Sequence, residues 1–263
     1  PHQQIIEIQG RPPLAYDLCS INIGSTPSVM QVAGVGQYAL SAKPIDQFIA
    51  KWQRIVDKIQ HHEGVFKLVI VGAGAGGIEL ALSSQQRIQQ LILDRQLSAL
   101  SLNCSIVTQD SVILAGHNTG VRARFSRILN DRDIRVIKNR KVTAIDERSI
   151  SFEHGDRMQA DLVIYVTHAQ APAWPAASGL AVDDQGFIQV NEYLQSTSHD
   201  NVFAVGDIAA LPQRCPKSGV YAVKQGKILA RNLILAAHDK PLKKYKPQRH
   251  ALSLIGTGDK NAV

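Results

Sequence analysis

The sequence predicts an α/β fold in which helices cover a parallel sheet. Between residues 44 and 165, stretches with helical spacing of apolar residues alternate with short apolar runs typical of buried strands. One of these runs, KLVIV at 67–71, passes directly into a glycine-rich turn that opens a helical stretch. Beyond residue 168, a connection rich in Pro, Ala and Ser, QAPAWPAASG, marks a crossing into a second domain.

The first half of the chain predicts a strand, a connecting helix and a strand–helix–strand unit. Residues 16–27, YDLCSINIGSTP, read as a short strand closed by a Gly-Ser-Thr-Pro turn. The strand KLVIV, a helix over about 76–90 and the strand SIVT at 105–108 form the strand–helix–strand unit. Before it, a helix begins after Pro44, because apolar residues recur there at helical spacing: Ile45, Phe48, Ile49, Trp52, Ile55, Val56 and Ile59.

The second half repeats this alternation and then changes character. A helix is predicted over 122–133 and a strand over 134–137. KVTAID, SISFEH and DLVIYV read as short strands separated by turns. The alternation as a whole predicts a parallel sheet with a small antiparallel appendage. After the crossing, strands are predicted in FIQV and NVFAVG, followed by a helix over 219–237. We expect the apolar side of this helix to face the core rather than a membrane: Val220, Val223, Leu229, Leu233 and Ala236.

Composition narrows the class of protein. The chain has 263 residues, of which 44% are hydrophobic, enough for one large domain or two modest ones. No apolar run approaches the roughly 20 residues of a membrane-spanning helix, so we expect a cytoplasmic protein, with peripheral attachment at the inner membrane face as the alternative. The net charge of +7 comes from dispersed basic residues, and no nucleic-acid partner is expected. Cys19, Cys104 and Cys215 lie far apart without a C-x-x-C pair and predict neither a redox disulfide nor a metal site.

The stretch LVIVGAGAGGIELAL at 68–82 predicts a dinucleotide site of the Rossmann type. Gly72 allows the tight turn, Gly74 lets the backbone approach a pyrophosphate, and Gly77 lets the helix pack on its strand. The phosphate would lie at the helix N-terminus, where unpaired amides favour an anion. Glu79 is either a surface residue or a contact near the nicotinamide. A carboxylate at the end of the second strand is typical of an NAD site, and an arginine there is typical of an NADP site. The stretch SIVTQDS contains neither in a secure position, so the sequence does not decide between NAD and NADP.

A second motif lies in LQSTSHDNVFAVGDIA at 194–209. A strand that ends in Gly206-Asp207 presents a carboxylate at the sheet edge where cofactors bind. In this context the stretch resembles the flavin-binding motif of the pyridine nucleotide-disulfide oxidoreductase superfamily, which implies that Gly206 and Asp207 hold the ribityl chain of FAD. YDLCSINIGSTP and DLVIYVTHAQAPAW are similar to the two domain crossings of that family. PKSGVYAVKQG is similar to its helix facing the flavin ring, which implies that Val220 and the turn before it lie near the ring.

This resemblance implies a domain plan and a branch of the family. A Rossmann-like, three-layer NAD(P)-binding domain, residues 43–167, would be inserted in a partial FAD-binding domain made of residues 1–42 and 168–263. Since no redox-active cysteine pair is present, the chain most resembles the type II NADH dehydrogenase branch. Its ending, PQRHALSLIGTGDKNAV, is similar to modules fused ahead of selenide, water dikinase, which would make that kinase a fused partner domain. Whether the protein forms a homodimer is left open.

Two departures from the family pattern shape these expectations. The family's first motif, a strand with G-x-G-x-x-G for the ADP half of FAD, is absent from these residues, and Pro1 begins within a strand-like pattern, IIEIQG. We therefore expect the chain to be a piece of a longer protein, to bind NAD(H) weakly, to purify without flavin and to be inactive alone. His168 replaces the glycine of the second crossing, either as a tolerated loop substitution or as a site residue.

The function implied for the intact protein is hydride transfer from NAD(P)H to FAD and then to an unidentified acceptor, a quinone or a soluble molecule. The flavin supplies the chemistry, so no catalytic side chain and no metal are expected. The alternative is a non-catalytic nucleotide-binding or docking module of a larger fusion protein. A one-domain dehydrogenase is disfavoured, because FAVGD follows downstream and no Tyr-x-x-x-Lys pair is present.

Overall fold

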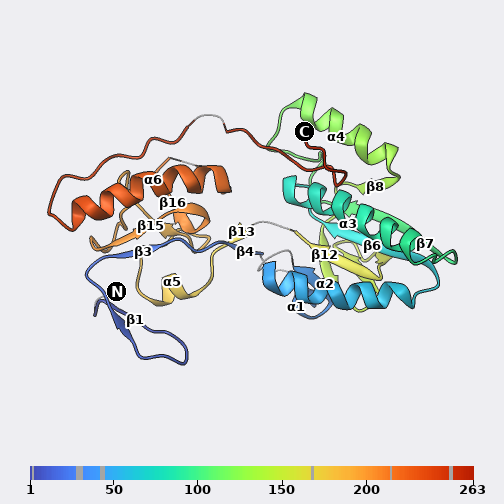
Figure 1. The fold of residues 1–263 in the computed structure, drawn as a ribbon, viewed down its shortest axis with the longest axis horizontal. Coiled ribbons are helices and arrows are strands. Elements are labelled where there is room, and N and C mark those ends of the chain that lie inside the picture. Colours follow the sequence, from blue (N-terminus) through green and yellow to red (C-terminus); the bar gives the residue numbers. More distant parts are fainter. Residues whose placement is uncertain (2, 28–31, 42–44, 167–168, 214, 249–250) are drawn as a thin grey trace. The chain divides into compact units, whose positions relative to one another are not determined.

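The chain folds into two compact units. The computed structural model describes all of residues 1–263 except 2, 28–31, 42–44, 167–168, 214 and 249–250. Unit 1 consists of Pro1–Thr26 and Ala169–Ser253, and unit 2 of Pro27–His168 and Leu254–Val263. In Figure 1, unit 1 carries the blue N-terminal strands and the orange helix α6, while unit 2 carries the green elements.

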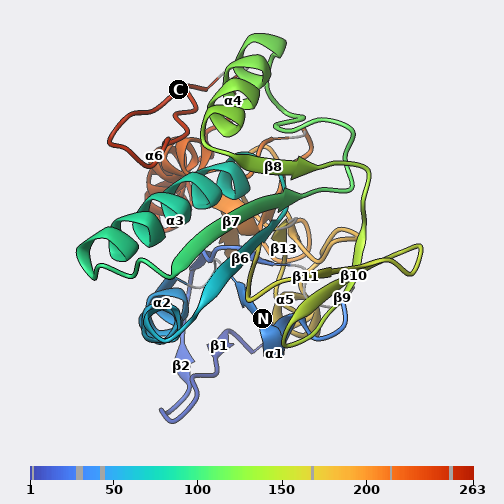
Figure 2. The same cartoon turned by 90° about the vertical axis from the view of Figure 1, so that its right-hand side faces the viewer.

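Unit 2 is built on a parallel sheet of five strands. Their order is β5 (Ala39–Ser41), β12 (Leu162–Tyr165), β6 (Gly64–Val71), β7 (Leu100–Val107) and β8 (Ile134–Ile137), and every neighbouring pair is parallel. Figure 2 shows β6, β7 and β8 side by side. Three longer helices belong to this unit: α2 (Ile45–Gln60), α3 (Ala75–Asp94) and α4 (Thr119–Asp131). Helices α3 and α4 connect successive parallel strands, as the alternation in the sequence predicts.

The central strand β6 is buried on both faces because its side chains alternate between two cores. Leu68 and Ile70 join the core beneath the helices, whereas Val69 and Val71 join the core on the opposite face. That opposite face is covered by the short helix α1 (Val35–Tyr38) and an antiparallel sheet of β9 (Val142–Ile145), β10 (Ser149–Phe152) and β11 (Arg157–Gln159). Unit 2 therefore has three layers.

Among the described residues, unit 1 and its boundary at Thr26 hold four two-stranded pairs, of which two matter for the site. β3 (Cys19–Ile21) pairs in parallel with β15 (Val202–Ala204), and β14 (Ile188–Gln189) pairs in parallel with β16 (Ala209–Ala210). The other pairs are β1 (Ile5–Ile6) with β2 (Leu14–Ala15), and β4 (Thr26–Pro27) with β13 (Ala169–Gln170). The helices are α5 (Trp174–Ala177), the short 3₁₀ helix η1 (Gly206–Ile208) and α6 (Gly219–Ala236).

The predicted α/β fold with a parallel sheet and a small antiparallel sheet is confirmed, and one detail of the prediction is wrong. Leu229 of α6 is buried, but Val220 and Val223 are 40% and 67% exposed and do not face the core. By contacts, unit 2 takes in Leu254–Val263 from the end of the chain as well as Pro27–His168. In the part of the chain that the structure describes, no helix is long and apolar enough to cross a membrane.

Candidate dinucleotide site

The glycine-rich turn joins β6 to α3 in a conformation that only glycine fits. Gly72 has φ +120°, in the region that residues with a side chain rarely adopt. Gly77 packs so closely on the turn that a Cβ at this position would lie 1.9 Å from the carbonyl oxygen of Gly72. The first and third glycines therefore hold the start of α3 tightly against the end of β6.

The second glycine faces open space at the N-terminus of α3. Gly74 is the N-cap residue, and a Cβ added to it would meet nothing within 4 Å. The first amides of a helix have no partners within the helix, and the helix dipole places partial positive charge at this end. A 20-residue helix with an uncrowded, cap-free N-terminus is a suitable binding site for a pyrophosphate.

A pocket lies at the same edge of the sheet, at the ends of the next two strands. Backbone hydrogen bonds connect the strand ends in turn: Gly72 N–H donates to Val107, and Thr108 N–H donates to Ile137. The loops beyond are joined as well, since Arg140 N–H donates to the Thr108 carbonyl at 2.9 Å. The pocket has a volume of about 370 Å³ and is lined by Gln109, Asp110, Asn139, Arg140, Lys141, Phe152, Glu153 and His154.

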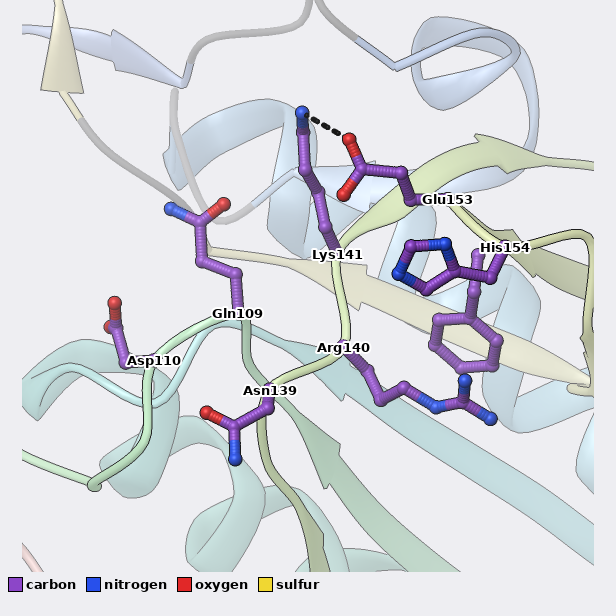
Figure 3. A pocket seen from close by; sticks show the side chains of 8 residues that line it. Gln109, Asp110, Asn139, Arg140, Lys141, Glu153 and His154 are labelled. Atoms are coloured by element: carbon purple, nitrogen blue, oxygen red, sulfur yellow. Dashed lines mark hydrogen bonds and ion pairs between the residues drawn. The ribbon is translucent and has the colours of Figure 1, made fainter.

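The cations of this pocket are already paired with carboxylates. Lys141 Nζ lies 3.1 Å from Glu153 Oε1, the pair joined by a dashed line in Figure 3. Arg140 bonds Asp156 at 2.7 Å, and its guanidinium lies 4.9 Å from the centre of the Phe152 ring. Asp110 follows β7 and accepts a hydrogen bond from the Thr108 hydroxyl at 3.4 Å. The pocket thus offers amide and carboxylate acceptors beside neutralised cations.

Glu79 lies in the second turn of α3 and is exposed. Its Oε1 atom accepts the backbone N–H of Gly256 at 3.0 Å. Glu79 is thus two residues beyond Gly77 along α3, and its hydrogen-bond partner comes from the far end of the chain.

The second predicted motif forms a separate site within unit 1. β3 and β15 end together, and Val205 N–H donates to the Ile21 carbonyl at 3.1 Å. Gly206 follows with φ +74°, and a Cβ there would lie 2.9 Å from Asn22 Oδ1. The Asp207 carboxylate accepts the hydroxyl of buried Ser25 at 3.2 Å. A carboxylate is thus presented at the carboxyl end of two parallel strands, as the sequence predicts.

Two side chains from the last part of unit 1 hold this loop in place. The buried Gln225 of α6 accepts the Gly206 N–H at 2.6 Å. Lys217 donates to the backbone carbonyls of Asp207 at 2.7 Å and Ala209 at 3.0 Å. Burial of Lys217 lowers its pKa, although the nearby carboxylates, including that of Asp207, act in the opposite direction. The position of the Asp207 backbone therefore depends on residues ten and more positions away.

The remaining predicted residues are less closely tied to these sites. Val220 lies in the first turn of α6 and is exposed, and His168 is outside the described residues. The three cysteines are free thiols, and burial raises the pKa of Cys104 to about 12, so this thiol is neutral at physiological pH. Among the described residues, no group of three or more His, Cys, Asp or Glu side chains is arranged to hold a metal ion.

Comparison with known proteins identifies the family. The family model described as "Pyridine nucleotide-disulphide oxidoreductase" matches residues 5–226. The chain belongs to this family. Its members include flavin-dependent NAD(P)H oxidoreductases, and the match extends across the glycine turn, the Gly206-Asp207 motif and the first half of α6.

The similar proteins have low sequence identity to this chain, and their own chains are longer. Ferroptosis suppressor protein 1 of Taeniopygia guttata is 26% identical over 223 residues, which cover 76% of this chain and 56% of that protein. A type II NADH:quinone oxidoreductase of Haemophilus influenzae is 25% identical over 260 residues, covering 89% and 59%. The solved sulfide:quinone oxidoreductase of Aquifex aeolicus aligns with a TM-score of 0.79 at 18% identity, covering 98% of this chain and 63% of that one, which shows a shared fold. The chain thus spans a little over half the length of these curated relatives.

Of the residues that line the pocket, only Gln109 and Asp110 lie in the stretch SIVTQDS, where the sequence predicts the ribose end of a dinucleotide site. A signal for the others was present: the polar run Lys138 to Lys141 directly follows the strand at 134–137. Because parallel strands end at the same edge of a sheet, side chains after β8 must lie beside those after β7. The two carboxylates that neutralise the cations, on Glu153 and Asp156, come from the antiparallel sheet and its turn. Spacing in the sequence gives no sign of those pairs.

Proposed function

We propose that this chain is the nicotinamide-binding part, with a portion of the flavin-binding part, of a type II NADH dehydrogenase-like enzyme. In this proposal NADH binds to unit 2 and passes a hydride to FAD, which is held in part by unit 1, and the electrons continue to an acceptor. The single observation that carries the proposal is the geometry of the glycine turn. Gly77 packs closely on Gly72, and the N-terminus of α3 at Gly74 is open.

The proposed position of the dinucleotide follows from the order of the strand ends. The pyrophosphate lies at the first turn of α3, and the adenosine extends over β7 and β8 to the pocket containing Gln109 and Asp110. The nicotinamide then leaves the glycine turn on the other side, where the Glu79 carboxylate can accept the N–H of its carboxamide. No side chain of unit 2 is needed as an acid or base, because the hydride moves directly between cofactors.

We further propose that NADH is preferred to NADPH. A 2′-phosphate brings up to two negative charges and needs uncompensated cations. In the pocket, Lys141 and Arg140 are paired with Glu153 and Asp156, and Asp110 adds another carboxylate. A ribose diol, in contrast, can donate its hydroxyl hydrogens to the Gln109 and Asp110 oxygens.

The residues of unit 1 fit the ribityl half of FAD. The Asp207 carboxylate stands at the end of two parallel strands beside Ser25, and Gly206 packs so closely on Asn22 that a Cβ there would lie 2.9 Å from Asn22 Oδ1. The first amides of α6 begin at Gly219, after the N-cap residue Ser218, with Val220 exposed in this turn. When bound, the flavin accepts a hydride and passes electrons on. Asp207 orients the ribityl hydroxyls, and the helix end supports negative charge on the ring.

The acceptor proposed is a quinone. The Haemophilus influenzae and Aquifex aeolicus proteins are named as quinone oxidoreductases, and this supports the choice of acceptor class. The stretch PQRHALSLIGTGDKNAV, which resembles modules ahead of selenide, water dikinase, supports a fused kinase domain as partner. Cytoplasmic location with peripheral membrane attachment as the alternative belongs to the same proposal.

The test is NADH oxidation by the full protein that contains this chain, with added FAD and a water-soluble quinone. We expect NADH-dependent quinone reduction that falls at least tenfold in Gly74→Ala and in Asp207→Ala, with Gly116→Ala as a matched control, since a Cβ at Gly116 also meets nothing within 4 Å. Full activity in the Gly74 variant would refute the assignment of the glycine turn. Absence of reduction together with intact NADH binding would favour a docking module.

A further inference from the structure

The last ten residues form a small hairpin that belongs to unit 2. We call residues 254–263 the C-terminal hairpin. Ile255 and Val263 exchange two backbone hydrogen bonds, each of 3.0 Å, and Thr257 N–H donates to the Asn261 carbonyl at 2.9 Å. Gly258 turns the chain with φ +85°. Within a segment this short, closed backbone pairing indicates a defined structure rather than an extended end.

This hairpin is docked on α3 and α4 by burial, close packing and charge. Ile255 is only 1% exposed and joins the core beneath the helices of unit 2. A Cβ at Gly258 would lie 2.8 Å from the Leu82 carbonyl oxygen of α3, so only glycine fits there. Arg132, at the end of α4, forms an ion pair with Asp259 at 2.9 Å. Three independent observations thus place the hairpin against α3, α4 and the core beneath them.

The docked hairpin presents one backbone amide to Glu79. Gly256 N–H donates to Glu79 Oε1 at 3.0 Å. A Cβ at Gly256 would lie 2.7 Å from the same oxygen and within 3.7 Å of Glu79 Cδ and Cγ. Gly256 therefore supplies a hydrogen bond to the carboxylate and, having no Cβ, leaves room for it at that position. An exposed glutamate is otherwise free to occupy several rotamers.

We propose that Gly256 is a positioning residue for the dinucleotide site. It holds one oxygen of the Glu79 carboxylate, so that the other oxygen is directed at the nicotinamide end of the ligand. The proposal rests on the function proposed above, in which Glu79 accepts the carboxamide N–H. A carboxylate serves this group and not the pyrophosphate, because like charges repel. Fixing the carboxylate before binding removes the rotamer entropy that the ligand would otherwise have to offset.

The test compares two ligands that differ only at the nicotinamide end. Dissociation constants for NADH and for ADP-ribose are measured by calorimetry on the 263-residue chain and on Gly256→Ala, Glu79→Ala and the double variant. Because the atom nearest the new Cβ is the end of a flexible side chain, we expect Gly256→Ala to fold and to displace Glu79. Loss of one positioned hydrogen bond predicts about fivefold weaker NADH binding and less than a twofold change for ADP-ribose.

A positional role and a structural role give different results in this set. In the Glu79→Ala background, Gly256→Ala should have no further effect on NADH binding, since it acts only through Glu79. Glu79→Gln, which keeps an acceptor for Gly256 without a change at the glycine, should weaken NADH less than Glu79→Ala. Gly116→Ala serves as the control for a Gly-to-Ala change in open space.

Four outcomes would overturn the proposal. Equal weakening of NADH and ADP-ribose by Gly256→Ala would show a general structural effect, and unchanged or tighter NADH binding would show that the hairpin contact does not assist the ligand. If the unsubstituted chain binds ADP-ribose and NADH equally well and Glu79→Ala changes neither, Glu79 has no role at the nicotinamide end. If the chain binds neither ligand, the proposed dinucleotide site itself fails, and the role of Gly256 fails with it.

Discussion

Replacing Gly77 by alanine should cost both stability and dinucleotide binding. The added Cβ would lie 1.9 Å from the Gly72 carbonyl oxygen and 2.8 Å from its carbon. Both are backbone atoms, so α3 must move by roughly 1 Å away from the end of β6 to restore van der Waals contact. Overpacking of this kind costs about 1–3 kcal/mol, which corresponds to a decrease in Tm of roughly 2–12 °C for a chain of this size.

The same displacement moves the amides at the start of α3 away from a bound pyrophosphate. We expect NADH binding, measured by calorimetry, to weaken at least tenfold in Gly77→Ala. Gly74→Ala separates the two effects, because its Cβ meets no protein atom and enters the space proposed for the ligand. That variant should lose less than about 1 kcal/mol of stability, mainly through the poorer N-cap, and still bind NADH poorly.

The reasoning would be refuted if Gly77→Ala kept the thermal stability and NADH affinity of the unsubstituted chain. It would also be refuted if Gly74→Ala bound NADH normally. Gly116→Ala, whose Cβ also meets nothing within 4 Å, is the matched control for a Gly-to-Ala change and should match the unsubstituted chain in both measurements.

Further predictions concern specificity, a buried amide and a buried thiol. The double substitution Glu153→Gln with Asp156→Asn removes the carboxylates that pair with Lys141 and Arg140. It should improve NADPH affinity severalfold in calorimetric titrations and leave NADH affinity within twofold. No gain in NADPH affinity would contradict the charge argument. The Asn232 side chain hydrogen-bonds the carbonyls of Tyr193 and Lys243 and the N–H of Lys243 at 2.8–2.9 Å, and Asn232→Leu leaves these three backbone groups without that partner. The free energy of unfolding measured in urea should fall by about 3 kcal/mol. A decrease below about 1 kcal/mol would contradict a structural role for these hydrogen bonds. Burial raises the pKa of Cys104 from 9.0 to about 12, so between these pH values the native state keeps a proton that the unfolded state loses. As the pH rises from 9 to 12, this thiol should therefore lower the free energy of unfolding by about 1.4 kcal/mol per pH unit. Urea unfolding of Cys104→Ala over the same range checks it, since an unchanged pH slope in this variant would disprove the contribution.

Much of unit 2 could be predicted from the sequence because its elements follow local rules. The strand at 134–137 and the helix after Pro44 agree with the structure to within a residue or two, since apolar periodicity reports directly on which face is buried. The glycine spacing also fixes the turn, as only glycine tolerates φ +120° at position 72 and close packing at position 77. Predictions from local pattern are therefore most dependable where one backbone conformation is required.

Periodicity was misleading for α6, where apolar residues on one side of the helical wheel do not all share the core. Val223 is exposed, although Leu229 on the same predicted side is buried. The wheel gives relative directions only, and the extent of the covering surface depends on tertiary packing. The contact of residues 254–263 with α3 has a similar cause, since nothing local to these residues shows that they pack on a helix some 175 residues earlier in the chain.

The most direct test of the central claim is an NMR titration of the ¹⁵N-labelled 263-residue chain with NADH. The account predicts saturable shifts in the backbone amides of residues 72–79, with smaller shifts in residues 109–110 and 139–141 around the pocket. Shifts confined to unit 1, or no shift at the glycine turn at concentrations that saturate binding by calorimetry, would contradict the claim that the nicotinamide dinucleotide binds at the N-terminus of α3.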